Sequence, residues 1–293
     1  MDIYVKKAII HQFSPDDTDL YLADKFLNIT PKIEEYLRKK IERVYSDEAR
    51  TGIFEEDNPF LEMISDDLLE TSVAVANRWK EEFVVSENQK TNDLVFVEFS
   101  KEGVDHFAFL RIALRETLTH LGGEVDNPIK LTQNNLPGFG TGADEALVIN
   151  LQSRKYHLIE KRIKYNGTFL NYFSENLLQA QPKISPKKSI KALEKTAQKI
   201  AESFNTDDFQ FQSKVKSTIF NHIEEENKLS PEKLADDLFD DNLTARLSFI
   251  DQVKEAVPEP VTFEEIDASR QLKKFENQKL SLSNGIELIV PNN

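Results

Sequence analysis

The sequence LVFVEFSKEGVDHFAFLRIAL, residues 94–114, places two apolar segments on either side of a short polar link. The segments 94–99 and 106–114 are rich in aromatic and aliphatic residues that favour strands, and the link contains Gly103. This pattern is typical of a β-hairpin. We therefore expect an antiparallel sheet in the N-terminal half of the chain.

Further strands and helices are predicted around this hairpin. Four other segments have the length and apolar content of strands and are expected to pair two by two: 3–13 with 20–22, and 146–151 with 156–163. Helices are predicted to begin at Thr30-Pro31 and at Asn58-Pro59, because a capping residue followed by proline is a common helix start. Another helix is expected over residues 168–178, which are rich in aromatic and leucine side chains.

The rest of the chain is predicted to be mainly helical. The expected helices cover residues 185–204, 207–226, 231–239, 243–256 and 263–275, and a hairpin over 280–290 turns at Asn284-Gly285. The predicted fold class is α+β. An N-terminal mixed domain, residues 1–165, has an antiparallel β-sheet flanked by helices. A mainly α-helical C-terminal domain, residues 166–293, ends in a β-hairpin.

The composition is that of a globular, acidic protein. Of the 293 residues, 39% are hydrophobic and the formal net charge is −14, so the chain can bury a core but cannot coat nucleic acid by its bulk charge. The sequence has no cysteine, which excludes disulfides and thiolate metal sites. No apolar run approaches a membrane span and residues 1–7 lack the apolar stretch of a signal peptide, so we expect a cytoplasmic protein.

One stretch, residues 154–199, reverses the sign of the charge. Its eleven Lys and Arg against three Glu give a charge of +8, so with −14 for the whole chain the remaining residues carry −22. Such an asymmetry indicates a localised anion-binding surface, and phosphate is the obvious ligand.

Within this stretch, Ser185-Pro186 predicts the start of a helix with two different faces. At about 100° per residue, the lysines from Lys188 to Lys199 fall within an arc of roughly 80° and span about 16 Å. Apolar side chains cluster on the opposite side, so one face can be buried while the other meets a row of phosphates. The lysines of an ordinary solvent-exposed helix face have the same pattern. We favour a functional site because the rest of the chain has an excess of acidic residues. The predicted phosphate-contacting residues are Arg154, Lys155, Lys161, Arg162, Lys164, Lys187, Lys188, Lys191, Lys195 and Lys199.

Other chemical motifs are incomplete. Residues 138–142 are glycine-rich but lack the Gly-Lys-Ser/Thr ending of a P-loop, so a surface loop is expected there. The five histidines have no metal-ligand spacing, and no nucleophile elbow occurs. The carboxylates that lie on or beside strands, where a Mg²⁺-dependent nuclease could place its ligands, are Asp93, Glu98, Asp105 and Glu160. We nevertheless predict no catalytic residue, no cofactor and no metal site.

Short sequence marks along the chain carry a family resemblance. They are Ile9-Ile10-His11-Gln12, Val44-Tyr45-Ser46, Gly52-Ile53-Phe54, the hairpin 94–114, and Ser269 to Phe275 near the end. In this order they resemble the NdpA/YejK-type nucleoid-associated proteins of bacteria, over nearly the whole chain. The resemblance implies association with the bacterial chromosome and, for some members, a link to topoisomerases. It supplies no catalytic motif.

Three functions follow from the residues and the resemblance together, in this order of preference. The first is nucleoid-associated, non-enzymatic binding of double-stranded DNA through the basic stretch, with phosphate contacts dominating and little sequence specificity. The second is a protein-interaction module whose acidic helices between residues 207 and 267 dock on a topoisomerase or another nucleoid protein. The third is a metal-dependent nuclease. A homodimer, which would raise the avidity for DNA, is compatible with the first.

Overall fold

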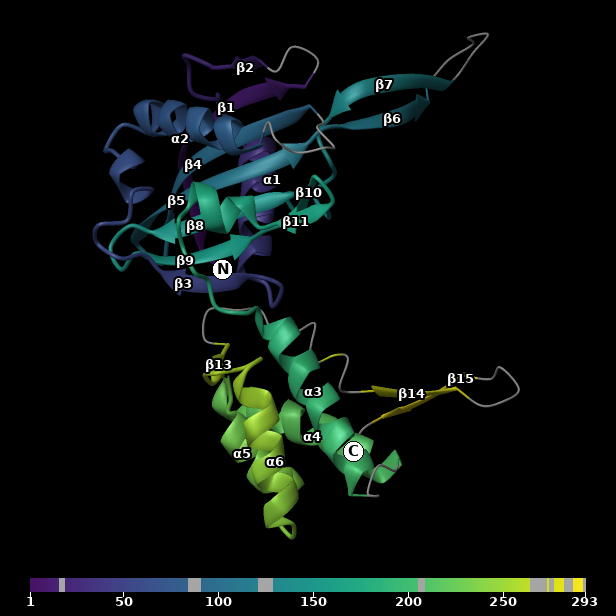
Figure 1. Ribbon diagram of the computed structural model, residues 1–293. Coiled ribbons are helices and arrows are strands. Elements are labelled where there is room, and N and C mark those ends of the chain that lie inside the picture. The colour runs from purple at the N-terminus through teal and green to yellow at the C-terminus, as the bar shows by residue number, and fades with distance from the viewer. Residues whose placement is uncertain are drawn as a thin grey trace. The chain divides into compact units, whose positions relative to one another are not determined.

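The computed structural model divides the chain into two compact units (Figure 1). It describes residues 1–15, 19–83, 91–120, 129–204, 209–263, 273, 277–281 and 287–291, and gives the backbone alone for 209, 277–281 and 287–291. The first unit holds residues 1–44 and 50–183, and the second holds residues 45–49 and 184–293. Among the described residues, no helix is both long and apolar enough to cross a membrane.

A seven-stranded antiparallel sheet forms the centre of the first unit, in the order β2-β1-β4-β5-β8-β9-β3. Its strands are β1 (Ile3–Ser14), β2 (Asp19–Tyr21), β3 (Arg50–Ile53), β4 (Asn92–Lys101), β5 (Val104–Ala113), β8 (Glu145–Asn150) and β9 (Lys155–Ile159). The predicted hairpin is confirmed as β4 and β5, joined by Glu102 and Gly103. Both linking residues have positive φ, 54° and 81°, as a type I′ turn requires.

Different helices cover the two faces of the sheet. They are α1 (Pro31–Glu42) and α2 (Leu68–Phe83), with short helical turns at η1 (Arg43–Tyr45), η2 (Leu61–Met63) and η3 (Phe173–Leu177), the last a π-helix. Ile9 and Phe96 join one core cluster with Trp79 of α2. The adjacent residues Ile10 and Val95 line a groove with side chains of α1. Because successive side chains of a strand point to opposite faces, α1 and α2 pack on opposite sides of the sheet.

The start of α1 is confirmed, whereas the predicted start of the second helix is wrong. The Thr30 hydroxyl caps α1 by accepting the Ile33 amide at 3.4 Å. Asn58 does not start an α-helix: its side-chain oxygen accepts the Phe60 amide at 2.9 Å in the turn before η2, and its side-chain amide donates to the carbonyls of Leu178 and Gln179, each at 3.1 Å. The helix α2 begins ten residues later, at Leu68.

The predicted helix over residues 168–178 is also wrong for its first part. Residues 168–170 form β11 (Thr168–Leu170), which pairs with β10 (Ile163–Tyr165), and helical structure is confined to the π-turn η3. Asn166 and Gly167 between these strands have φ of 47° and 79°. An Asn-Gly pair is a strong hairpin signal, and here it outweighs the helical spacing of the apolar residues that follow.

A buried polar network joins five parts of the first unit. Arg111 of β5 donates to Glu145 of β8 at 2.7 Å and to Asn92 of β4 at 2.9 Å. The Tyr172 hydroxyl donates to the same Glu145 oxygen and accepts the indole N–H of Trp79 of α2 at 3.1 Å. Glu145 is fully buried and Tyr172 is 1% exposed. The network therefore ties the chain before η3 to the sheet, and residues 166–183 lie in the first unit.

The described residues of the second unit form four helices and two strand pairs. They are α3 (Pro186–Ser203), α4 (Phe209–Glu226), α5 (Pro231–Leu238), α6 (Leu243–Lys254), β12 (Lys228–Leu229) with β13 (Val261–Thr262), and β14 (Asn277–Ser281) with β15 (Glu287–Pro291). These helices and the terminal hairpin confirm the predicted mainly helical segment. The predicted helix over 263–275 lies almost wholly outside the described residues, as does the turn at Asn284-Gly285.

Two further strands, β6 (Arg115–His120) and β7 (Ile129–Asn135), were not predicted. They pair only with each other among the described strands and extend away from the seven-stranded sheet (Figure 1). All of their residues except Thr132 and Asn135 are exposed. The low apolar content of these strands explains why hydrophobic patterning did not reveal them.

Replacing Tyr172 by Phe is expected to destabilise the first unit. The Trp79 indole N–H would lose its acceptor and Glu145 would lose a donor, and each unpaired buried group costs about 1–3 kcal/mol. We expect a loss of about 2–4 kcal/mol in the free energy of unfolding. Urea unfolding followed by the fluorescence of Trp79, the only tryptophan, measures it. Tyr165→Phe, at a 40% exposed position, is the matched control, and equal stabilities of the two variants would contradict the role of the network.

Acid should destabilise the first unit through His11. His11 Nδ1 accepts the Ala23 amide at 3.0 Å, Nε2 lies 3.0 Å from the Ser72 hydroxyl, and burial lowers the pKa of His11 to about 4. The unfolded chain, in which the pKa of His11 has its ordinary value of 6.5, therefore binds this proton first as the pH falls. Stability should fall between pH 6.5 and pH 4, by up to about 3 kcal/mol for this group. The difference in unfolding free energy between wild type and His11→Asn across this range isolates the effect, and a difference that does not change with pH would refute it.

Candidate nucleic-acid interface

The helix α3 presents a row of lysines to solvent. Lys188, Lys191, Lys195 and Lys199 are all exposed, as the helical spacing predicts. Their ammonium groups make no hydrogen bond or ion pair with the part of the chain that the structure describes. We call these four residues the lysine face.

The orientation of the lysine face follows from the opposite side of the helix. Ile190, Leu193, Ala197 and Ile200 of α3 are buried in the core of the second unit. Their core neighbours include Val215 of the next helix. Turning α3 so that the lysines were buried would therefore expose a set of fully apolar side chains, at a cost of about 1.5–3 kcal/mol for each large one.

A groove beside the lysine face adds a cation that the sequence analysis missed. It has a volume of about 350 Å³ and is lined by Lys191, Glu194 and Lys195 of α3 together with Lys216 of α4. The amide side chains of Gln198 and Gln212 and the apolar Phe211 and Val215 complete the lining. Three ammonium groups and one carboxylate thus share one groove. Lys216 lies on a different helix from the predicted stripe, so helical spacing within α3 could not identify it.

Two acidic residues, Glu48 and Glu202, lie near the two ends of the lysine face and limit its length. The Lys187 ammonium pairs with Glu48, and the Lys187 amide donates to the Asp47 carbonyl at 2.9 Å. Lys187 therefore serves to hold the start of α3 against the segment 45–49 of the same unit. At the other end of the helix, Glu202 is exposed and falls within the same arc as the lysines, so the row of positive charge ends at Lys199.

The five predicted basic residues of the first unit all have interaction partners. Arg154 pairs with Glu56 at 3.2 Å, and Lys161 pairs with Asp144 at 2.7 Å. Arg162 donates to the Asn171 side chain at 3.3 Å. Lys155 and Lys164 also have interaction partners. The ten predicted residues thus divide equally between the two units, five in each.

The carboxylates considered for a nuclease are dispersed. No group of three His, Cys, Asp or Glu side chains within the described segments could hold a metal ion. Each of the four has its own partner: Asp93 accepts from Gln12 at 3.3 Å, and Glu98, Asp105 and Glu160 pair with Lys7 at 3.8 Å, Lys6 at 2.5 Å and Arg50 at 3.0 Å. Asp93 and Glu98 lie at different places along β4, Asp105 is on β5 and Glu160 follows β9, so proximity to strands did not bring the four carboxylates together.

The acidic side chains proposed for protein docking also have internal partners. Asp236 pairs with Arg246 at 3.1 Å, Asp237 with His222 at 2.7 Å, Asp240 with Lys214 at 3.8 Å, and Glu226 with Lys233 at 2.7 Å. Part of the negative charge of the second unit is therefore neutralised between its own helices.

The glycine-rich loop over residues 138–142 surrounds a cation. The ammonium group of Lys40, which is fully buried, donates to the carbonyls of Pro137 at 3.2 Å, Gly138 at 2.9 Å and Thr141 at 2.6 Å. A phosphate-binding loop directs backbone N–H groups at its ligand, whereas these carbonyls point at an internal lysine. The loop is thus fastened to α1 and is not built as a phosphate cradle.

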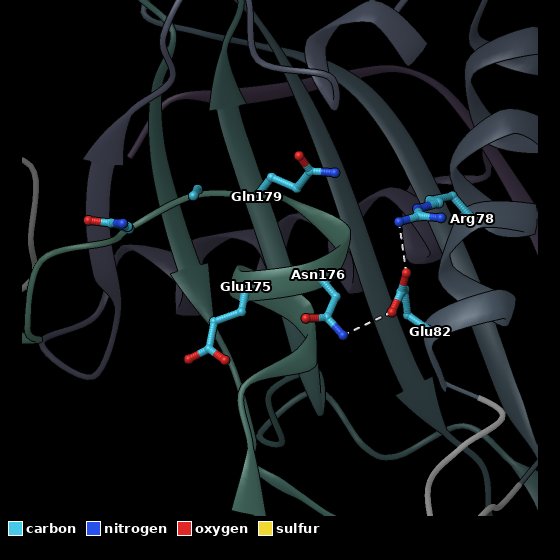
Figure 2. Close-up of a pocket in the computed structure, with 7 residues that line it drawn as sticks. Arg78, Glu82, Glu175, Asn176 and Gln179 are labelled. Carbon is cyan, nitrogen blue, oxygen red and sulfur yellow. Dashed lines mark hydrogen bonds and ion pairs between the residues drawn. The ribbon is translucent and has the colours of Figure 1, made fainter.

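A polar cleft of about 550 Å³ lies between α2 and η3 (Figure 2). Glu82 in this cleft pairs with Arg78 at 2.8 Å and accepts the Asn176 amide at 3.0 Å. Figure 2 shows both interactions on the wall of the cleft, while Glu175 points away from them. Because its arginine is already neutralised, this cleft offers less to an anion than the groove between α3 and α4 does.

Comparison with known proteins agrees with the resemblance found in the sequence. The model of a protein family described as "Nucleoid-associated protein YejK" matches residues 9–293. No curated protein matches the chain significantly. The chain belongs to the YejK family of nucleoid-associated proteins.

Proposed function

We propose that this member of the YejK family binds double-stranded DNA in the nucleoid, as a non-enzymatic protein of the cytoplasm, through the lysine face of α3. The observation that carries the proposal is that the four lysines are exposed and have no partner in the described chain, whereas the chain as a whole has a net charge of −14. A local cluster of unpaired cations in an acidic protein is suited to an extended anion.

The dimensions of the lysine face fit a phosphate backbone. The residues from Lys188 to Lys199 span about 16 Å of helix at about 1.5 Å per residue. Phosphates of one DNA strand repeat about every 3.4 Å along the duplex axis, so four to five of them cover about the same length. A row of this length can therefore reach several phosphates of a duplex.

The groove between α3 and α4 supplies the strongest anchor for a phosphate. Lys191 and Lys195 belong to both the lysine face and the groove, and Lys216 approaches from the second helix. Cations from two helices fix the position of a phosphate better than a single row does, because the groove restricts the direction of approach. Glu194 offsets one of the three positive charges in the groove.

The same chemistry implies little sequence specificity. Lysine ammonium groups are point charges that contact phosphates, and such contacts position a protein on DNA without distinguishing bases. The basic residues of the first unit, from Arg154 to Lys164, are expected to contribute less. Each would have to exchange an existing partner such as Glu56 or Asp144 for a phosphate.

Reversing the lysine face should abolish DNA binding. The change Lys188→Glu, Lys191→Glu, Lys195→Glu and Lys199→Glu replaces four attractive contacts by repulsion, and we expect the dissociation constant for a duplex to rise more than about a hundredfold. Fluorescence anisotropy with a labelled duplex at fixed salt measures the change. Circular dichroism should be unaltered, because the four side chains are exposed.

The matched control reverses four exposed lysines elsewhere and changes the net charge equally. It combines Lys25→Glu, Lys32→Glu, Lys228→Glu and Lys254→Glu. This variant should lose much less affinity than the lysine-face variant. Equal losses would show that the affinity for DNA depends only on the net charge of the protein. Unchanged binding by the lysine-face variant would contradict the proposed site.

A further inference from the structure

The ribbon formed by β6 and β7 has one apolar face that is open to solvent. Leu118 pairs with Leu131 and His120 pairs with Ile129. Because directly paired residues share a face of an antiparallel ribbon, these four side chains lie on one side, which we call the ribbon face. The exposed fractions of Leu118, Ile129 and Leu131 are 72%, 52% and 51%.

The opposite face of the ribbon is polar and internally satisfied. The hydroxyls of Thr117 and Thr119 lie 3.2 Å and 2.8 Å from the Thr132 hydroxyl, and Lys130 is on the same side. The ribbon is therefore amphipathic, with its leucines directed away from its own polar side. A two-stranded hairpin is only marginally stable alone in water, and an apolar patch with a polar rim is typical of an interaction site.

The polar groups at the two ends of the ribbon face are complementary. Glu116 is at the base, and its carboxylate accepts the side-chain amide of Gln133 at 3.2 Å. Gln133 comes two residues after Leu131 and so lies on the ribbon face, which places the Glu116 carboxylate there too. His120 is at the outer end of the described strands. The face thus runs from a carboxylate through a leucine pair to an imidazole.

We propose that the ribbon face packs against the ribbon face of a second copy of this chain. The two ribbons are antiparallel about a two-fold axis through the pair Leu118–Leu131. Leucines of both copies then form the centre of the contact, and Glu116 of each copy meets His120 of the other. A two-fold contact uses the same patch twice, so one complementary pair of ends becomes two favourable contacts.

The chemistry of the ribbon face favours a second copy over DNA. A phosphate backbone requires several cations on one face, but Lys130 pairs with Thr119 and so lies on the other side of the ribbon. The ribbon face has one carboxylate, one imidazole and three large aliphatic side chains. This dimer contact is independent of the proposed DNA-binding face, which lies in the other unit.

Sedimentation velocity of the full chain tests the dimer. Wild type should sediment as a dimer of twice 33.7 kDa at micromolar concentration. Leu118→Glu with Leu131→Glu buries four carboxylates in the contact and should raise the dissociation constant of the dimer at least about a hundredfold. Lys130→Glu, on the opposite face, is the matched control and should remain dimeric.

Single-cysteine cross-linking tests the geometry without disturbing the ribbon. The sequence contains no cysteine, so Leu118→Cys and Thr119→Cys each introduce one thiol, on opposite faces. Packed sheets are about 10 Å apart, too far for a direct disulfide, and a short bis-maleimide bridges that gap. We expect efficient covalent dimers from Leu118→Cys and few from Thr119→Cys.

Each of three results would overturn the proposal. They are a monomeric wild type at tens of micromolar, a dimer that persists in the double glutamate variant, and equal cross-linking at positions 118 and 119. If the double glutamate variant lost affinity for DNA with no change in mass, the ribbon would be a DNA contact instead. Failure of DNA binding in a variant that stays dimeric would count against the lysine face alone.

Discussion

The buried pair of Arg111 and Glu145 is the constraint on which the first unit depends. An ion pair removed from water depends on further hydrogen bonds to its charged groups. Asn92 accepts from Arg111, and Tyr172 donates to the same Glu145 oxygen as Arg111 does. Trp79 in turn donates to Tyr172, while the second carboxylate oxygen of Glu145 has no hydrogen-bond partner among the described residues. Burial of the two charges therefore requires five parts of the first unit to be in place. They are β4, β5, β8, α2 and the segment before η3. The long sheet and the connection toward the second unit are thus linked by one polar network.

In the second unit, the burial of one side of α3 determines what the other side can do. Ile190, Leu193 and Ile200 pack into the core, and this packing fixes the rotation of the helix. The four lysines then face solvent at a regular spacing, with no partner in the described chain. A single amphipathic helix in this way both completes a core and provides a row of positive charge. The function that we propose requires no catalytic group, only that this row stay unpaired.

Local signals predicted much of this protein from its sequence. Continuous apolar segments correctly predicted the central hairpin, and Thr30 before Pro31 correctly predicted the start of α1. Both structures depend on residues that are neighbours in the sequence. The helix predicted over 168–178 failed where Asn166-Gly167 imposed a turn. Lys187 was predicted to contact phosphate because its partner, Glu48, is 139 residues away in the sequence and could not be identified from local spacing. Lys216 was missed for the same kind of reason, because a groove between helices depends on tertiary packing.

The dependence of DNA affinity on salt tests the central claim most directly. If the four lysines each displace one counterion, the logarithm of the association constant should fall with the logarithm of salt concentration with a slope near −3.6, at about −0.9 for each contact. Replacing Lys191 by Met should make that slope less steep by about 0.9, whereas replacing Lys228 by Met should leave it unchanged. A slope that is the same in wild type and Lys191→Met would show that α3 does not contact the phosphate backbone.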